Sequence, residues 1–227
     1  HAYKLARLVS ERPLPPEAAR RGTIGLPRVL NMYEDYPFWF TFFTQLGYRV
    51  ELSSLPDQHA QSKSLETISS DSICYPAKLA HSHIFSLLAK GVAKIFYPCV
   101  LDNQKPDKKH ASHYNCPVVA SYPEVLRANI EQLQQDSITF WHAFLPLDDP
   151  KRLAKRLHTE LASEDLTVYE VKAAVEAAWK ERETYREDIR RYTRQALQES
   201  EEKKLTGIVL AGRPYHLDPA VNHGLPS

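Results

Sequence analysis

Between Pro76 and Val100 the chain reads PAKLAHSHIFSLLAKGVAKIFYPCV. Its first part, residues 76–90, predicts a helix that starts at a proline and ends before Gly91. Its second part, residues 92–100, is an almost continuous apolar run, which is typical of a strand buried on both faces. A helix that leads through a short turn into such a strand is half of the alternating pattern that builds a parallel sheet.

The same alternation occurs on both sides of this segment. We expect strands at 23–30, 48–53 and 118–121, and helices at 37–46 and 123–133. The prediction for residues 22–146 is therefore an α/β domain, a three-layer arrangement in which a parallel sheet carries helices on both faces.

The flanking segments have a different composition. Residues 1–21 are charged, contain three prolines and predict a linker or an N-terminal helix. Residues 147–205 are rich in charge, with apolar positions three and four apart, which predicts a charged helical hairpin packed on the main domain. An oligomeric coiled coil fits less well, because Arg182 interrupts the apolar seam. Residues 206–227 predict the first strand and loop of a truncated second α/β unit, so we expect the chain to be part of a longer polypeptide.

The bulk composition is that of an ordinary globular protein. Of the 227 residues, 43% are hydrophobic and 25% are charged, and the formal net charge is +1. We therefore expect neither a nucleic-acid nor a membrane partner, and no apolar run or signal peptide argues otherwise. Three cysteines make a disulfide framework a poor hypothesis and favour a reducing, cytoplasmic location.

Each cysteine stands next to a proline or one residue from it: Cys74-Tyr-Pro76, Pro98-Cys99 and Cys116-Pro117. Thiolates hold iron–sulfur clusters, and a helix N-terminus such as the one predicted after Cys74 favours a thiolate. Cys99 comes at the end of a buried strand, at the edge of a parallel sheet where ligands bind. Cys116 would enter from the opposite edge if residues 118–121 ran parallel to their neighbour.

The spacing of the three cysteines leaves other readings open. It matches no short zinc or ferredoxin motif, and buried free thiols are common in proteins. A zinc site with three cysteines and one histidine is a further alternative. Its histidine would be His81, His83, His110 or His113.

Two basic residues are candidates for binding a cofactor or substrate. Arg28 follows the first predicted strand and could bind a phosphate of a CoA ester or nucleotide, or it could be an ion-paired surface residue. Lys78 lies in the first helical turn after Cys74 and could donate to cluster sulfur, or it could be solvated. The sequence contains no Walker loop and no G-x-G-x-x-G, so a glycine-rich nucleotide loop is poorly supported.

Several short and uncommon sequence motifs occur together in this chain. They are TIGLPRVLNMYE at 23–34, YPFW at 36–39, SICYPAK at 72–78, FYPC at 96–99, NCPVV at 115–119 and GRPYH at 212–216. In these motifs the chain resembles the acyl-CoA dehydratase activase-related proteins, which are similar to the 2-hydroxyacyl-CoA dehydratase components and to double-cubane cluster proteins.

The resemblance implies flavodoxin-like α/β units in which three cysteines per unit bind an iron–sulfur cluster. It would be a [4Fe-4S] cubane or half of a double cubane, with Cys74, Cys99 and Cys116 as its ligands. The resemblance also implies two partners, namely an activator ATPase that delivers low-potential electrons and a second cluster-bearing unit. ATP would bind only to that activator, outside this chain.

These inferences lead to one hypothesis and one alternative. The chain would be the cluster-bearing module of an ATP-activated reductase or 2-hydroxyacyl-CoA dehydratase-type system, unable to turn over substrate alone, with no catalytic residue assigned. The alternative is a non-enzymatic structural or docking domain of a larger activase-related protein, either zinc-bound or metal-free.

Overall fold

The computed structural model describes residues 1–55, 58–102 and 113–226. The strands are β1 (Thr23–Leu26), β2 (Arg49–Leu52), β3 (Lys94–Phe96) and β4 (Thr139–Trp141). The α-helices are α1 (Ala2–Leu8), α2 (Met32–Gln45), α3 (Gln58–Leu65), α4 (Tyr75–Ala89), α5 (Pro117–Asn129), α6 (Pro150–Glu160), α7 (Val168–Glu202) and α8 (Pro219–Asn222). Short 3-10 turns are η1 (Pro16–Ala18), η2 (Glu131–Gln134), η3 (Ala162–Glu164) and η4 (Pro214–Leu217).

The four strands form one all-parallel sheet in the order β2-β1-β3-β4. β1 pairs with β2 from Thr23 opposite Arg49 to Leu26 opposite Leu52, and β3 pairs with β4 through Ile95 opposite Phe140. The order agrees with the first four strands of the flavodoxin-like order 2-1-3-4-5. Its topological switch point lies between β1 and β3, and ligands bind at the carboxyl ends of the strands beside such a point.

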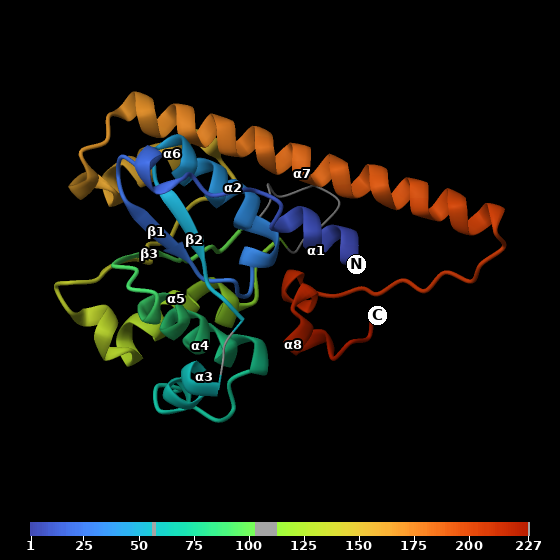
Figure 1. Ribbon diagram of the computed structural model, residues 1–227, viewed down its shortest axis with the longest axis horizontal. Helices are drawn as coiled ribbons and strands as arrows, with labels where there is room; N and C mark the ends of the chain where they lie inside the picture. The colour runs from blue at the N-terminus through green and yellow to red at the C-terminus, as the bar shows by residue number, and fades with distance from the viewer. Residues whose placement is uncertain (56–57, 103–112, 227) are drawn as a thin grey trace.

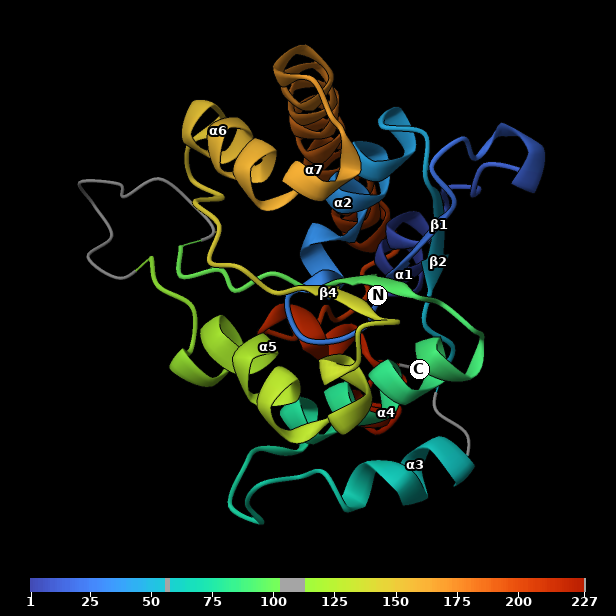
Figure 2. The same ribbon diagram turned by 90° about the vertical axis from the view of Figure 1, so that its left-hand side faces the viewer.

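Helices cover both faces of the sheet. In Figures 1 and 2, α2, α6 and α7 lie on one face and α4 and α5 on the other, with α3 outside α4. The expected three-layer α/β arrangement is therefore confirmed. Two glycines have the positive φ that lets a helix end sharply, at +88° for Gly47 after α2 and +72° for Gly91 after α4.

Aromatic side chains of α2 make up much of the core. Trp39 and Phe43 of α2 pack on Phe96 of β3, with ring centroids 4.6 and 4.8 Å apart. Phe38 of the same helix packs edge-on against Trp179 of α7. These residues join the sheet to the long helix, so the aromatic cluster serves packing.

The strand expected at 118–121 is wrong, because these residues belong to α5. Pro117 starts the helix, and Val119, Tyr122 and Leu126 are buried at the three-to-four spacing of a helix face. The fourth strand is β4, which the sequence analysis did not identify. Its Phe140 and Trp141 are buried, but three residues are too short a run for periodicity to detect.

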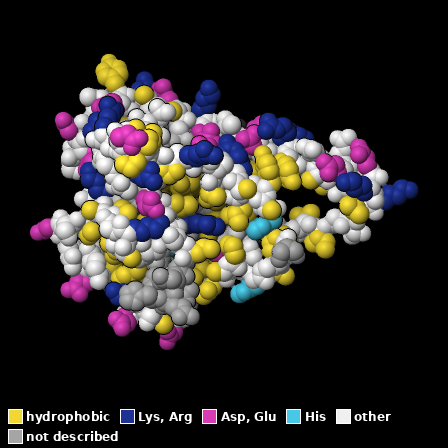
Figure 3. Space-filling model, in the orientation of Figure 1, with side chains coloured by type: hydrophobic (Ala, Val, Ile, Leu, Met, Phe, Trp, Pro, Cys, Tyr) yellow, Lys and Arg dark blue, Asp and Glu magenta, His cyan; other side chains and the backbone are white. Residues whose placement is uncertain are grey.

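The expected helical hairpin is formed by α6 and α7, which pack against each other, and α7 also packs against α2. Arg182 does not interrupt the seam. Its side chain is buried, donates to the Leu147 carbonyl oxygen at 3.1 Å and lies over the Trp179 ring at 5.2 Å. The end of α7 extends beyond the body of the protein, where Figure 3 shows Lys and Arg side chains mixed with Asp and Glu.

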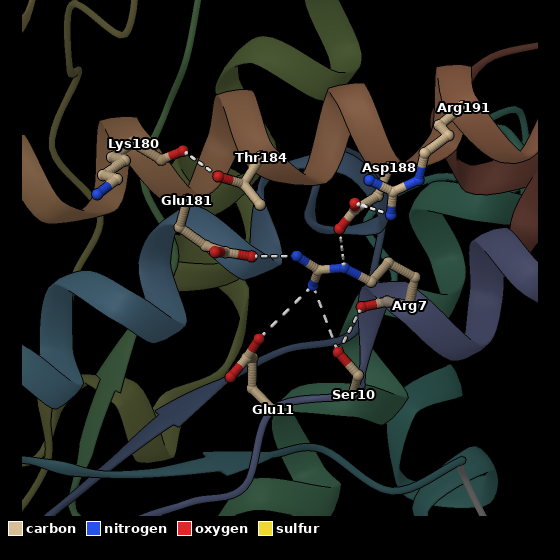
Figure 4. Close-up of polar contacts among 8 residues, drawn as sticks. All are labelled: Arg7, Ser10, Glu11, Lys180, Glu181, Thr184, Asp188 and Arg191. Carbon is tan, nitrogen blue, oxygen red and sulfur yellow. Dashed lines mark hydrogen bonds and ion pairs between the residues drawn. The ribbon is translucent and has the colours of Figure 1, made fainter.

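The N-terminal segment is a short helix held by an ion-pair cluster. Arg7 of α1 binds Glu181 at 2.6 Å and Asp188 at 2.9 Å, both on α7 (Figure 4). This contact holds α1 along the long helix α7. Of the two structures considered for this segment, a linker or an N-terminal helix, residues 2–8 adopt the helix.

Residues 207–212 form no strand in the structure, contrary to expectation. Ile208 and Val209 are 84% and 88% exposed, because none of the described strands lies beside them to pair with. After this segment, η4 and α8 fold back toward α2, and Leu217 and Asp218 are buried there. Whether 206–227 starts a second α/β unit stays a prediction.

Candidate functional site at the carboxyl edge of the sheet

The candidate residues gather where the parallel strands end. In such a sheet, each helix that leads into the next strand runs antiparallel to the strands. The N-termini of α2, α4 and α5 therefore lie near the carboxyl ends of the strands. Three positive helix ends at one edge favour anionic groups there.

Cys74 occupies the N-cap position of α4, as predicted. Its backbone is extended, with φ −61° and ψ 144°, and Pro76 lies in the first turn of the helix. The side chain is exposed and makes no capping hydrogen bond. The thiol is therefore accessible to a metal or to a reagent.

Cys116 occupies the matching position of α5. Its backbone has φ −54° and ψ 134°, and Pro117 starts the helix. The expectation that Cys116 enters from the opposite edge is wrong, because a helix rather than a strand follows it. The helix N-terminus brings Cys116 to the same edge as Cys74, and both side chains are at least partly accessible.

Cys99 follows β3 in a different environment. Its main chain is paired with the segment after β4, since its N–H donates to the Ala143 oxygen at 3.0 Å and its oxygen accepts from the Leu145 N–H at 2.9 Å. The side chain is fully buried. Burial raises the pKa of the Cys99 thiol to about 12, so the neutral thiol is favoured at pH 7.

The three cysteines share one edge of the sheet but do not form a ligand set in this arrangement. Among residues 1–55, 58–102 and 113–226, no group of three or more His, Cys, Asp or Glu side chains is placed to hold a metal ion. Cys74 and Cys116 are accessible from solvent, and Cys99 is not. An iron–sulfur cluster bound by the three cysteines stays a prediction.

The histidines considered for a zinc site have other partners. Both ring nitrogens of His81 are engaged, Nδ1 with the Thr67 hydroxyl at 2.8 Å and Nε2 with the Tyr122 hydroxyl at 3.0 Å. His83 Nδ1 lies 2.8 Å from Ser53 Oγ. Burial lowers the pKa of His81 to about 4 and that of His83 to about 3, so both rings are neutral at pH 7.

The other two histidines add no zinc ligand in the described structure. His113 Nε2 lies 3.5 Å from Asp102 Oδ1, and His110 lies outside the described residues. Zinc coordination by three cysteines and one histidine therefore has no support in this arrangement.

Three tyrosines that the sequence analysis missed lie among the cysteines. Burial raises the pKa of Tyr215, and the nearby Cys116 and Cys74 raise it further. Burial also raises the pKa of Tyr122 to about 12, with Cys74 next to it, and the pKa of Tyr97 well above 10, with Cys99 next to it. Tyr97 and Tyr215 had a sequence signal, because they belong to the motifs FYPC at 96–99 and GRPYH at 212–216, whereas Tyr122 belongs to none of the quoted motifs.

Arg28 lies at the carboxyl end of β1, as expected. Its backbone N–H donates to Ser53 Oγ at 2.7 Å, and its guanidinium group lies over the Tyr33 ring, 5.6 Å from the centroid. Its Nε is buried without a hydrogen-bond partner among the described residues. Arg28 therefore lies at the switch point and forms no ion pair with the described residues, and a phosphate ligand for it stays a prediction.

Lys78 is engaged with its own chain. Its Nζ donates to the Asp71 carbonyl oxygen at 2.8 Å and so ties the loop before Cys74 to α4. A contact between Lys78 and a cluster would have to replace this hydrogen bond.

The whole sequence from Thr23 onward matches one family model. The match covers residues 23–227, and the family is described as the CoA enzyme activase uncharacterised domain. The chain belongs to this family. The predicted relationship to acyl-CoA dehydratase activase-related proteins is thereby confirmed.

Two further comparisons found no match for this chain, either among curated proteins or among solved structures. Within the described ranges, none of its helices combines the length and the apolar character needed to cross a membrane.

Proposed function

We propose that this chain is the cluster-bearing module of an ATP-activated reductase or 2-hydroxyacyl-CoA dehydratase-type system. One observation supports this above the others. All three cysteines lie at the carboxyl edge of one parallel sheet, and two of them, Cys74 and Cys116, stand at helix N-termini. A cubane or half of a double cubane bound there would supply one-electron transfer at low potential.

The chain's own residues would have three tasks at this edge. Cys74 and Cys116 would supply accessible sulfur ligands at the N-termini of α4 and α5, whose positive ends would favour an anionic cluster. Tyr97 and Tyr122 would limit the access of water, because their rings are buried around the cysteines. Cys99 would become a ligand only after losing its proton, which its buried position disfavours.

Partners and location follow from the same proposal. An activator ATPase, on a separate or longer chain, would bind ATP and deliver electrons to the edge, and a second cluster-bearing unit would complete a double cubane. The system would be cytoplasmic. We expect no ATP hydrolysis and no dehydration by this chain alone.

The test is anaerobic reconstitution with iron and sulfide, followed by iron and acid-labile sulfide analysis. We expect the chain to bind iron and sulfide together, and the double variant Cys74→Ser/Cys116→Ser to lose them. Full iron in the double variant would refute the ligand assignment. Zinc bound in place of iron, or no metal at all with the fold intact, would support the alternative of a structural or docking domain.

A further inference from the structure

A separate pocket lies beside the carboxyl ends of β3 and β4, with a volume of about 520 Å³. This volume is in the range of small-molecule sites. The pocket lies on the carboxyl side of the sheet beside the edge strand β4, away from the switch point between β1 and β3. One wall is α6, and the opposite side is formed by segments that follow Cys99 and β4. No residue assigned to the proposed cluster lines this pocket.

The wall from α6 is basic. Arg152, Lys155 and Arg156 line the pocket, while Leu153 and Leu157 on the other side of the helix are fully buried in the core. The buried leucines fix the rotation of α6, so its three cations are held toward the pocket.

The charges of this wall are only partly neutralised. Arg152 lies 3.8 Å from Asp148, and Arg156 lies 2.7 Å from Glu160. Lys155 has no side-chain hydrogen bond or ion pair within the part of the chain that the structure describes. The wall therefore offers a free ammonium group and unused guanidinium N–H donors, which suit phosphate oxygens.

The opposite side of the pocket is apolar. Leu101 and Phe144 are 52% and 43% exposed, and Pro146 lies beside them. Phe144 is held in place by its bridge to Cys99 and by the hydrogen bonds of its two neighbours. An exposed aromatic ring on a fixed backbone provides a stacking surface for a heteroaromatic base.

Two carboxylates complete the lining. Asp148 and Asp102 also line the pocket. Asp102 Oδ1 makes no hydrogen bond among the described residues and lies 3.5 Å from His113 Nε2. A carboxylate oxygen of this kind accepts from a hydroxyl group and repels a bare polyanion. A ligand that carries phosphates, hydroxyl groups and a base offers a chemical partner to the cations, the carboxylates and the aromatic ring.

We propose that this pocket binds a nucleoside diphosphate, with its phosphates on Arg152, Lys155 and Arg156 and its base on Phe144. The phosphate contacts come from side chains, which agrees with a sequence that has no glycine-rich phosphate loop. The proposal goes beyond the cluster function and does not depend on it.

The test is calorimetric titration of the full chain with ADP at low ionic strength. We expect saturable binding that weakens about tenfold in Lys155→Ala, the cost of one lost charge-assisted hydrogen bond. Lys151→Ala is the matched control, because Lys151 is an exposed lysine on the same helix that does not line the pocket. Both lysines are exposed, so neither change should disturb folding.

A second variant tests the contribution of the base to the affinity separately from that of the phosphates. Phe144→Ala should weaken ADP binding but leave the affinity for inorganic pyrophosphate unchanged. Absence of saturable ADP binding, or an equal loss in Lys151→Ala, would overturn the proposal. Pyrophosphate binding as tight as that of ADP would also overturn it. Iron content measured in the same samples keeps the outcome separate from that of the cluster proposal.

Discussion

Asp35 on α2 and Arg182 on α7 face each other inside the interface between the two helices, where they are 2% and 5% exposed. Burial raises the pKa of Asp35 to about 7, although the nearby Arg182 lowers it again in part. Asp35 Oδ1 has no hydrogen-bond partner among the described residues, and neither have Asn31 Nδ2 and Tyr97 Oη. All three residues line one cavity of about 10 Å³, which has room for a single water molecule.

The buried carboxyl predicts a pH-dependent stability. Because the pKa of Asp35 is raised in the folded state, the protein is most stable below the unfolded value near 4 and loses stability as the pH rises through 7. Asp35→Asn mimics the protonated form, so the variant should match the wild type most closely near pH 4, gain relative to it as the pH rises to about 7, and keep a constant difference above that. The nearby charged groups Glu34, Arg182 and Arg186 stay unchanged in both proteins.

Urea unfolding of both proteins from pH 4.5 to pH 8.5 measures this difference. A difference in unfolding free energy that does not change with pH would show that Asp35 titrates normally.

The contact of Arg7 with α7 predicts a local stability effect. Arg7 is 14% exposed and binds both Glu181 and Asp188 (Figure 4). Arg7→Ala should therefore lower the unfolding free energy by about 1–3 kcal/mol, the usual range for lost hydrogen bonds to charged groups. Hydrogen exchange should increase in α1.

Arg190→Ala is the control for this substitution. Arg190 is 62% exposed and only approaches Glu187 at 3.7 Å, so its loss should change stability by less than about 0.5 kcal/mol. Equal effects of the two substitutions would mean that the Arg7 cluster does not hold α1 in solution.

The three thiols should react with iodoacetamide at very different rates. Cys74 is exposed, Cys116 is partly buried and Cys99 is fully buried, with a pKa of about 12. Mass spectrometry of the reduced, metal-free protein should find Cys74 labelled first and Cys99 labelled only after denaturation. Native labelling of Cys99 at the rate of Cys74 would contradict the burial described.

Serine substitutions should affect stability differently at the exposed Cys74 and at the buried Cys99. Cys74→Ser should leave the fold intact, because serine caps a helix well, and should impair cluster assembly. Cys99→Ser should cost about 1–3 kcal/mol, because its hydroxyl would be buried without an assured partner. Thermal unfolding and bound iron measure both effects. A larger loss of stability in Cys74→Ser than in Cys99→Ser would contradict the exposed position of Cys74 and the buried position of Cys99.

Much of the layered fold could be predicted from local pattern. The alternation of helix and strand, the glycines after α2 and α4 and the hairpin of α6 and α7 all follow from periodicity and from helix-end residues. The prediction failed at 118–121, where two valines after Cys116-Pro117 look like a strand but start a helix. Short segments of this kind contain too few residues for their period to be read, and tertiary burial decides them.

The sequence alone determined the parallel α/β architecture, the family, and the position of Cys74 before a helix. These features depend on residues close together in the chain, whose conformational preferences act locally. Only the tertiary structure decided that Arg182 is buried opposite Asp35, that Cys99 is a neutral core thiol, and that Lys155 and Phe144 share a pocket. Burial and the proximity of distant residues set these properties, because desolvation and Coulomb interactions depend on every element packed around a group.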